Sequence, residues 1–166
     1  MNRENGIVPI PKKWAVRWLI VFSLLLAAAM SYIFYNSMQN AEESAKQSAA
    51  VVDLLKPIVG IDEGEDAESF GDLVRKLAHV FEFALLGLCI GGLLAGFHAL
   101  TGRLYVGAAL FWALLVGVAD EFIQSFTGRG SMVSDVLIDF SGALIGLLPM
   151  AVCFVVRSLV LRKHSR

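Results

Sequence analysis

The stretch that decides the fold covers residues 77–100 and reads LAHVFEFALLGLCIGGLLAGFHAL. As a helix rising about 1.5 Å per residue, it is long enough to cross a hydrocarbon core of about 30 Å. His79 and Glu82 stand at its start, and only His98 follows near its end. Ionisable groups within a membrane are costly unless they pair or face water, so they mark a functional site by default. The stretch predicts a membrane helix with one polar end.

Three further apolar segments have similar lengths. They cover residues 14–35, 104–123 and 136–156. Of the 166 residues, 57% are hydrophobic and only 17% are charged, which is unusual for a soluble domain. Because a lipid-exposed backbone must satisfy its own hydrogen bonds, we expect an all-α membrane protein with four transmembrane helices. For the first segment the alternative is a cleaved signal peptide, but its apolar residues continue past the small-residue site at 27–29, which favours an uncleaved helix.

Basic residues are distributed unequally around these segments. With the N-terminus inside, nine of the 14 Lys and Arg residues fall on the inner side. The positive-inside rule therefore predicts that both termini are cytoplasmic. We expect one four-helix domain at residues 14–156, between a cytoplasmic segment 1–13 and a basic cytoplasmic tail 157–166.

Residues 36–76 form the one long outer loop of this topology. Asn40 and Glu43 predict a capping box at the start of a helix, and apolar residues recur at helical spacing until Pro57, which we expect to end it. This helix would be amphipathic and lie on the outer interface or over the mouth of the bundle. The acidic stretch 60–68 is predicted to be mobile. The alternative is a solvated linker without a further role.

Polar residues from three predicted helices and one turn meet at the outer end. His79 and Glu82 share a helix face, and Lys76 lies one turn earlier. The candidate site, which we call the polar cluster, consists of Lys76, His79, Glu82, Asp120, Glu121, Gln124, Arg129, Asp135 and Asp139.

Glycines continue two of these polar faces toward the membrane centre. Gly87 and Gly91 follow the cluster on the second helix, and Gly142 and Gly146 follow it on the fourth. Small residues four apart let membrane helices approach closely. We expect a tight seam below the polar cluster, the alternative being that these glycines pack on other faces.

The turn before the last helix reads TGRGS at residues 127–131. Backbone N–H groups and the Arg129 guanidinium in such a turn suit an anion. The alternative is a tight turn in which Arg129 pairs with Asp120, Glu121 or Asp135.

Catalysis by the polar cluster is an open alternative. A metal site would combine His79 and Glu82 with Asp120, Asp135 or Asp139, but the H-x-x-E spacing is a weak signal, and no metal or cofactor is predicted from it. An acid–base site would combine His79 with a carboxylate. No serine, threonine or cysteine stands at a spacing that identifies a nucleophile, so enzymatic activity stays uncertain.

Two non-catalytic roles are also open. In a binding site, Lys76, His79 and Arg129 would contact a polar or anionic headgroup while the acidic residues hold them in place. In a purely structural network, the same groups would fix the register of the helices. Binding is our leading hypothesis.

Three motifs follow one another in order: RKLAHVFEF at 75–83, DEFIQSFTGR at 120–129 and SDVLIDFSG at 134–142. With the serine-containing run at 35–48, they resemble the VanZ-like family of small bacterial membrane proteins. The likeness extends from the first helix to about Gly146. Thr127 stands where members of that family often have proline, and the acidic insertion in the outer loop also departs from the family pattern.

The resemblance implies a location and a setting more than an activity. The name-giving member is associated with low-level resistance to the glycopeptide antibiotic teicoplanin, and most relatives have no assigned biochemical activity. It implies a multi-pass protein of the bacterial cytoplasmic membrane with a role in the cell envelope. The expected partners are the lipid bilayer and an anionic lipid or lipid-linked wall precursor. Homo-oligomerisation is left open, and nothing in the sequence indicates nucleic-acid binding.

Overall fold

The computed structural model describes residues 11–60 and 65–164, and within them the chain is helical, without strands. This confirms the all-α prediction. The helices, in chain order, are α1 (Lys12–Ser37), α2 (Ala41–Val59), α3 (Glu65–Thr101), α4 (Val106–Phe126) and α5 (Val133–His164).

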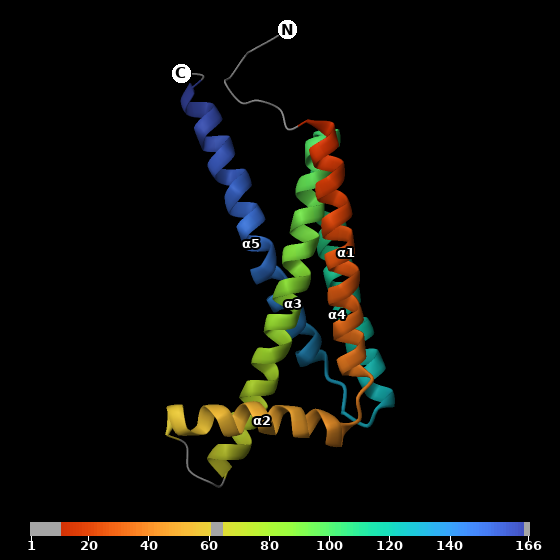
Figure 1. Ribbon diagram of the computed structural model, residues 1–166, viewed down its shortest axis with the longest axis vertical. Coiled ribbons are helices and arrows are strands. Elements are labelled where there is room, and N and C mark those ends of the chain that lie inside the picture. The colour runs from red at the N-terminus through yellow and green to blue at the C-terminus, as the bar shows by residue number, and fades with distance from the viewer. Residues whose placement is uncertain (1–10, 61–64, 165–166) are drawn as a thin grey trace.

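Four of these helices contain segments long and apolar enough to cross a membrane, as predicted: Lys12–Ser37, Ser69–Thr101, Val106–Phe126 and Val133–Val156. In Figure 1 they run along the long axis of the molecule, whereas α2 lies across one end. The beginning of α1 and the end of α5 are both at the opposite end. This arrangement agrees with termini on one side of a membrane, and their cytoplasmic location stays a prediction.

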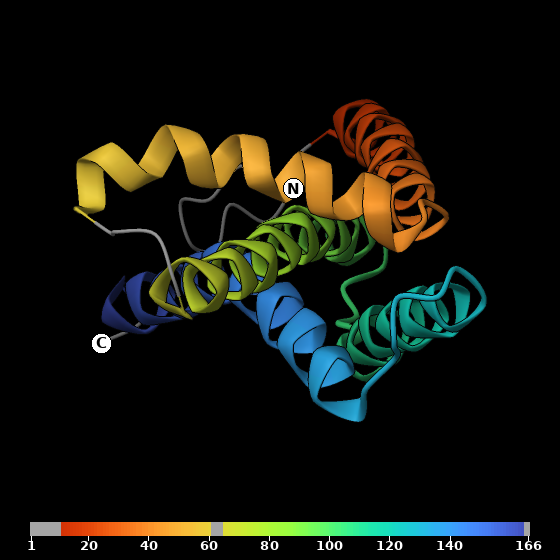
Figure 2. The ribbon, with the colours of Figure 1, turned by 90° about the horizontal axis from the view of Figure 1, so that it is seen from below.

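The central helix is α3, which contacts each of the other four helices and packs most extensively on α5. Figure 2 shows it between α1 and α2 on one side and α4 and α5 on the other. The α3–α5 contact is the predicted glycine seam. A Cβ added to Gly87 would overlap the backbone of Ala143, and one added to Gly146 would overlap that of Ala84. Gly142 faces the backbone of Val80 in the same way.

The packing of α1 on α3 uses a second pair of glycines. The rings and methyl groups of Phe22 and Leu19 occupy the space that side chains at Gly92 and Gly96 would need. Trp18 Nε1 donates a hydrogen bond to the carbonyl oxygen of Gly92 at 2.9 Å. Close backbone approach therefore joins α5 to α3, whereas α1 packs the side chains of Leu19 and Phe22 on glycines of α3.

The amphipathic helix predicted in the long loop is α2. The Asn40 side chain caps it by accepting a hydrogen bond from the Glu43 N–H at 2.9 Å, as expected. The prediction that Pro57 ends the helix is wrong, because α2 continues to Val59 and ends at Gly60, which has φ +73°. Gly60 has the left-handed conformation typical of a helix C-cap, and its N–H donates to the Lys56 carbonyl oxygen at 2.9 Å, so the glycine ends the helix.

The predicted outer loop is mostly helical. Besides α2 it contains the beginning of α3, since residues 65–68 of the acidic stretch already form the first turn of that helix. Residues 61–64, the rest of the stretch predicted to be mobile, lie outside the described residues. Helix α2 contacts α3, and Val52 of α2 and Val74 in this outward part of α3 are both buried.

Candidate functional site

Asp120 of α4 lies at the centre of the polar cluster and is fully buried. The Ser37 hydroxyl of α1 makes a short contact with its Oδ1 atom, and Gln124 Nε2 donates to its Oδ2 atom at 2.7 Å. Ser37 and Gln124 are themselves buried. The carboxylate of Asp120 therefore joins α1 to α4 and is held in one orientation by two donors.

His79 of α3 lies beside two buried carboxylates. Its Nδ1 atom is 3.2 Å from Asp139 Oδ1 and 3.8 Å from Asp120 Oδ2. One ligand atom from each of these three residues lies within 4.8 Å of the other two. We call this group the His–Asp triangle. Glu82 and Asp135, which were candidate ligands in the sequence, are not part of this group.

The glycine seam explains why residues of the His–Asp triangle lie close together. Gly142 lies three residues after Asp139 and contacts the backbone of Val80, which is the residue next to His79. On α4, Gly117 packs beside Asp139, whose Cβ would be in ordinary contact, at 3.4 Å, with a Cβ at that position. The close approach of α3 and α5 brings His79 and Asp139 together, and Asp120 joins them from α4.

The two glutamates of the polar cluster have separate partners. Glu82 Oε1 accepts a hydrogen bond from Asn36 Nδ2 at 3.0 Å. Glu121 Oε2 accepts one from the backbone N–H of Met132 at 3.1 Å, which fixes the chain just before α5 begins. Glu121 is thus buried at the turn and lies outside the His–Asp triangle.

Arg129, in the turn between α4 and α5, is partly buried and points toward α1. Its Nη1 atom donates to the carbonyl oxygen of Asn36 at 3.1 Å, and Thr127 Oγ1 donates to that of Ser37 at 3.3 Å. Gly128, with φ +74°, makes the turn possible because that backbone conformation favours glycine. Burial lowers the pKa of the Arg129 guanidinium, and the nearby charge of Arg75 lowers it further.

The alternative in which Arg129 pairs with an acidic residue is not found. Within the described residues, no carboxylate lies in ion-pairing distance of its guanidinium, although Asp120 and Glu121 are close enough to favour its charge. An arginine retains its charge in proteins. The turn therefore presents a half-buried cation that the described chain leaves without a directly paired counter-ion.

Lys76 and Asp135 lie at the edge of the polar cluster. Both line a small cavity of about 60 Å³ together with His79, Arg129 and Asp139. Lys76 is exposed and Asp135 is partly buried, with Ser134 Oγ 3.3 Å from its Oδ1 atom. Of the nine predicted site residues, these two have the weakest connection to the buried centre.

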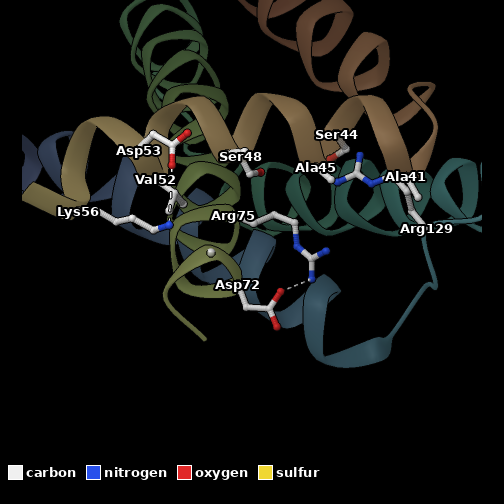
Figure 3. A pocket seen from close by; sticks show the side chains of 12 residues that line it. Ala41, Ser44, Ala45, Ser48, Val52, Asp53, Lys56, Asp72, Arg75 and Arg129 are labelled. Atoms are coloured by element: carbon white, nitrogen blue, oxygen red, sulfur yellow. Dashed lines mark ion pairs between the residues drawn. The ribbon is translucent and has the colours of Figure 1, made fainter. Parts of the chain in front are cut away.

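A larger cavity of about 340 Å³ lies between α2 and the outward part of α3 (Figure 3). Ser44, Ser48, Arg75 and Arg129 line it. Asp53, Lys56 and Asp72 also line it, and they form the ion pairs Asp53–Lys56 at 3.8 Å and Asp72–Arg75 at 3.3 Å. We call this space the α2 cavity.

The α2 cavity has an amphiphilic neighbour of about 500 Å³ between α1, α2 and α3. Its apolar lining includes Tyr32, Val51, Leu55, Leu77 and Phe81, and its polar lining includes Arg75, His79, Glu82 and Arg129. The exposed side chains of Tyr32, Leu77 and Phe81 belong to membrane-spanning segments. A ligand with a charged end and an apolar part matches this lining.

One known protein family matches a stretch of the chain that contains the entire polar cluster. Residues 22–156 match the family described as VanZ/LLP1. The chain belongs to this family. The VanZ/LLP1 match includes all three motifs and α2, and it confirms the resemblance found in the sequence. No curated protein and no solved structure matches the chain significantly.

Several residues around the site escaped the sequence reasoning. Asn36 and Ser37 were assigned to the beginning of the outer loop, but they form the last turn of α1 and contact Glu82 and Asp120. Arg75 lies one turn before His79, as Lys76 does, and this spacing was the available signal for it. The contribution of α2 serines depends on where that helix lies, which its own sequence does not specify.

Proposed function

We propose that this VanZ/LLP1 family member binds an anionic, phosphate-bearing lipid headgroup at the α2 end of its bundle. The lipid would be a membrane phospholipid or a lipid-linked wall precursor, in keeping with an envelope role. The observation that carries the proposal is Arg129, a half-buried cation without an ion-paired carboxylate among the described residues. An anion entering from outside the chain would supply that partner.

The α2 cavity offers the donors that a phosphate group needs. Arg75 and Arg129 both line it, and their planar guanidinium groups suit two-point contacts with phosphate oxygens. The hydroxyls of Ser44 and Ser48 lie in the same lining. The pairing of Arg75 with Asp72 is exposed, so it is worth at most about 1 kcal/mol and leaves Arg75 available to a ligand.

The amphiphilic neighbouring cavity favours a lipid over a soluble anion. It shares Arg75 and Arg129 with the α2 cavity, so one bound molecule can place its headgroup at the arginines and its chains beside Leu77 and Phe81. Contact of acyl chains with such an apolar wall adds affinity that inorganic phosphate lacks.

Lipid retention tests this proposal. The full-length protein is reconstituted in nanodiscs of equal parts phosphatidylcholine and phosphatidylglycerol, and the lipids that stay bound are identified by native mass spectrometry. We expect phosphatidylglycerol to be enriched on the wild type and lost from the Arg75→Gln/Arg129→Gln double variant.

Arg103→Gln is the control for each single substitution, Arg75→Gln and Arg129→Gln, because it makes the same Arg→Gln change at the opposite end of the bundle. It should retain phosphatidylglycerol as the wild type does. Equal retention by the double variant and by Arg103→Gln would contradict the proposal. Displacement of the bound lipid by inorganic phosphate alone would show that the site takes a soluble anion.

The alternative is a membrane-embedded enzyme that acts on a lipid-linked substrate by acid–base or metal-assisted chemistry. The position of His79 between two buried carboxylates favours it, since such a histidine can accept or donate a proton. Its signature is a headgroup product formed by purified protein, with His79→Gln abolishing turnover while phosphatidylglycerol retention persists.

A further inference from the structure

We infer that the His–Asp triangle of His79, Asp120 and Asp139 binds one divalent metal cation of the Mn²⁺ or Zn²⁺ type. The ligand atoms of the three residues lie within 4.8 Å of one another. One imidazole nitrogen with two carboxylates suits first-row transition ions, whereas Mg²⁺ and Ca²⁺ prefer oxygen ligands alone. The inference is independent of lipid binding at Arg129.

The state of Asp139 is a second observation that points to a cation. Its side chain is 1% exposed, yet neither carboxylate oxygen accepts a hydrogen bond from the described residues. A buried carboxylate in this state is unfavourable unless a cation neutralises it. His79 Nδ1 approaches to 3.2 Å but without the geometry of a hydrogen bond. A short approach without a direct hydrogen bond is what two groups that share a metal ion require.

Asp120 is oriented as metal-ligating carboxylates usually are. Ser37 and Gln124 hold its two oxygens, and its Oδ2 atom lies 3.8 Å from His79 Nδ1. Such outer partners fix the orientation of a ligand and raise metal affinity. Glu82 and Glu121 add further acidic groups near the triangle. A bound divalent cation would offset this concentration of acidic groups.

A cavity beside the triangle can hold the water molecules that would complete the coordination of the metal. His79, Gln124 and Asp139 also line the small cavity of about 60 Å³, which is large enough for water molecules. Three protein ligands with waters in the open positions is a common arrangement for such ions. The triangle therefore provides both the donor set and the access that a metal site needs.

Manganese binding tests the inference directly. The full-length protein in detergent is stripped with a chelator and mixed with Mn²⁺, and free Mn²⁺ is followed by its electron paramagnetic resonance signal. We expect about one Mn²⁺ bound per chain, displaced by Zn²⁺. Asp139→Asn and His79→Gln should weaken this binding at least tenfold.

Controls separate the triangle from general effects of mutation. Asp53→Asn and His98→Gln make the same chemical changes outside the triangle and its small cavity, and should bind Mn²⁺ as the wild type does. The Arg75→Gln/Arg129→Gln variant should also bind it normally, which keeps this test distinct from lipid retention.

If Asp139→Asn does not fold, Ser37→Ala provides the second variant, because it leaves all three ligands in place and removes only a donor to Asp120. Its Mn²⁺ affinity should fall about tenfold. A wild-type protein that leaves the Mn²⁺ signal unchanged overturns the inference. So do folded triangle or Ser37 variants that bind Mn²⁺ as the wild type does.

Discussion

The two ends of the helix bundle are built on different physical principles. At the α2 end, buried polar contacts join the helices: Ser37 of α1 meets Asp120 of α4, and His79 of α3 meets Asp139 of α5. At the opposite end, α1, α3 and α4 surround an apolar cavity of about 550 Å³ that includes Phe97, Tyr105 and Trp112 in its lining. There, no side-chain hydrogen bond within the described residues joins α4 to another helix.

This difference shows how α4 is attached. Helices α3 and α5 approach through glycines along their shared length, so dispersion contacts hold them together. Helix α4 has fewer close approaches, and its specific contacts involve Asp120, Glu121 and Thr127 near its end. The polar cluster therefore has a structural role in holding α4, in addition to any ligand that it binds.

The largest effect is expected in the glycine seam. Gly146→Ala places a methyl group against the backbone of Ala84, which cannot move without separating α3 from α5. We expect a loss of about 3 kcal/mol or more in the free energy of unfolding, measured by thermal unfolding in detergent. Gly107→Ala is the control, because a Cβ there meets nothing within 4 Å. Equal unfolding temperatures for the two variants would show that the seam tolerates an added side chain.

An intermediate effect is expected at the attachment of α4. Ser37→Ala removes a donor from the buried carboxylate of Asp120 and should cost about 1–3 kcal/mol in unfolding free energy. Ser31→Ala is matched to it, since the Ser31 hydroxyl, like that of Ser37, lies 2.8 Å from the backbone oxygen four residues earlier, but Ser31 is exposed and contacts no carboxylate. If chemical denaturation gives the same free energy for both variants, the Ser37–Asp120 contact does not hold α4.

The smallest effect is expected where α1 meets α3 away from the polar cluster. Trp18→Phe removes the hydrogen bond to Gly92 but keeps an aromatic ring beside Phe22. We expect a loss of about 0.6 kcal/mol in unfolding free energy, typical of hydrogen bonds between membrane helices. Trp14→Phe, on the same helix, should change the unfolding temperature less. If Trp18→Phe lowers the unfolding free energy more than Ser37→Ala does, the α1–α3 hydrogen bond stabilises the bundle more than the Ser37–Asp120 contact does.

Sequence reasoning succeeded where one helix carries its own signal. The four membrane-spanning segments follow from apolar length, the start of α2 from Asn40 and Glu43, and the seam from the spacing of Gly142 and Gly146. The end of α2 was misplaced because Gly60, which has the left-handed conformation of a C-cap, ends the helix in place of Pro57. Helical spacing alone could not assign partners between helices.

The sequence by itself determined the apolar helices, the family and most of the polar residues at the α2 end, because hydrophobic length, motif order and helical spacing are local properties of the chain. Only the tertiary structure decided which of those residues meet. It separated His79, Asp120 and Asp139 from Glu121 and Arg129, because side-chain contacts depend on how closely the helix backbones approach and how they are rotated. It also placed α2 across the end of the bundle, beside Arg75 and Arg129.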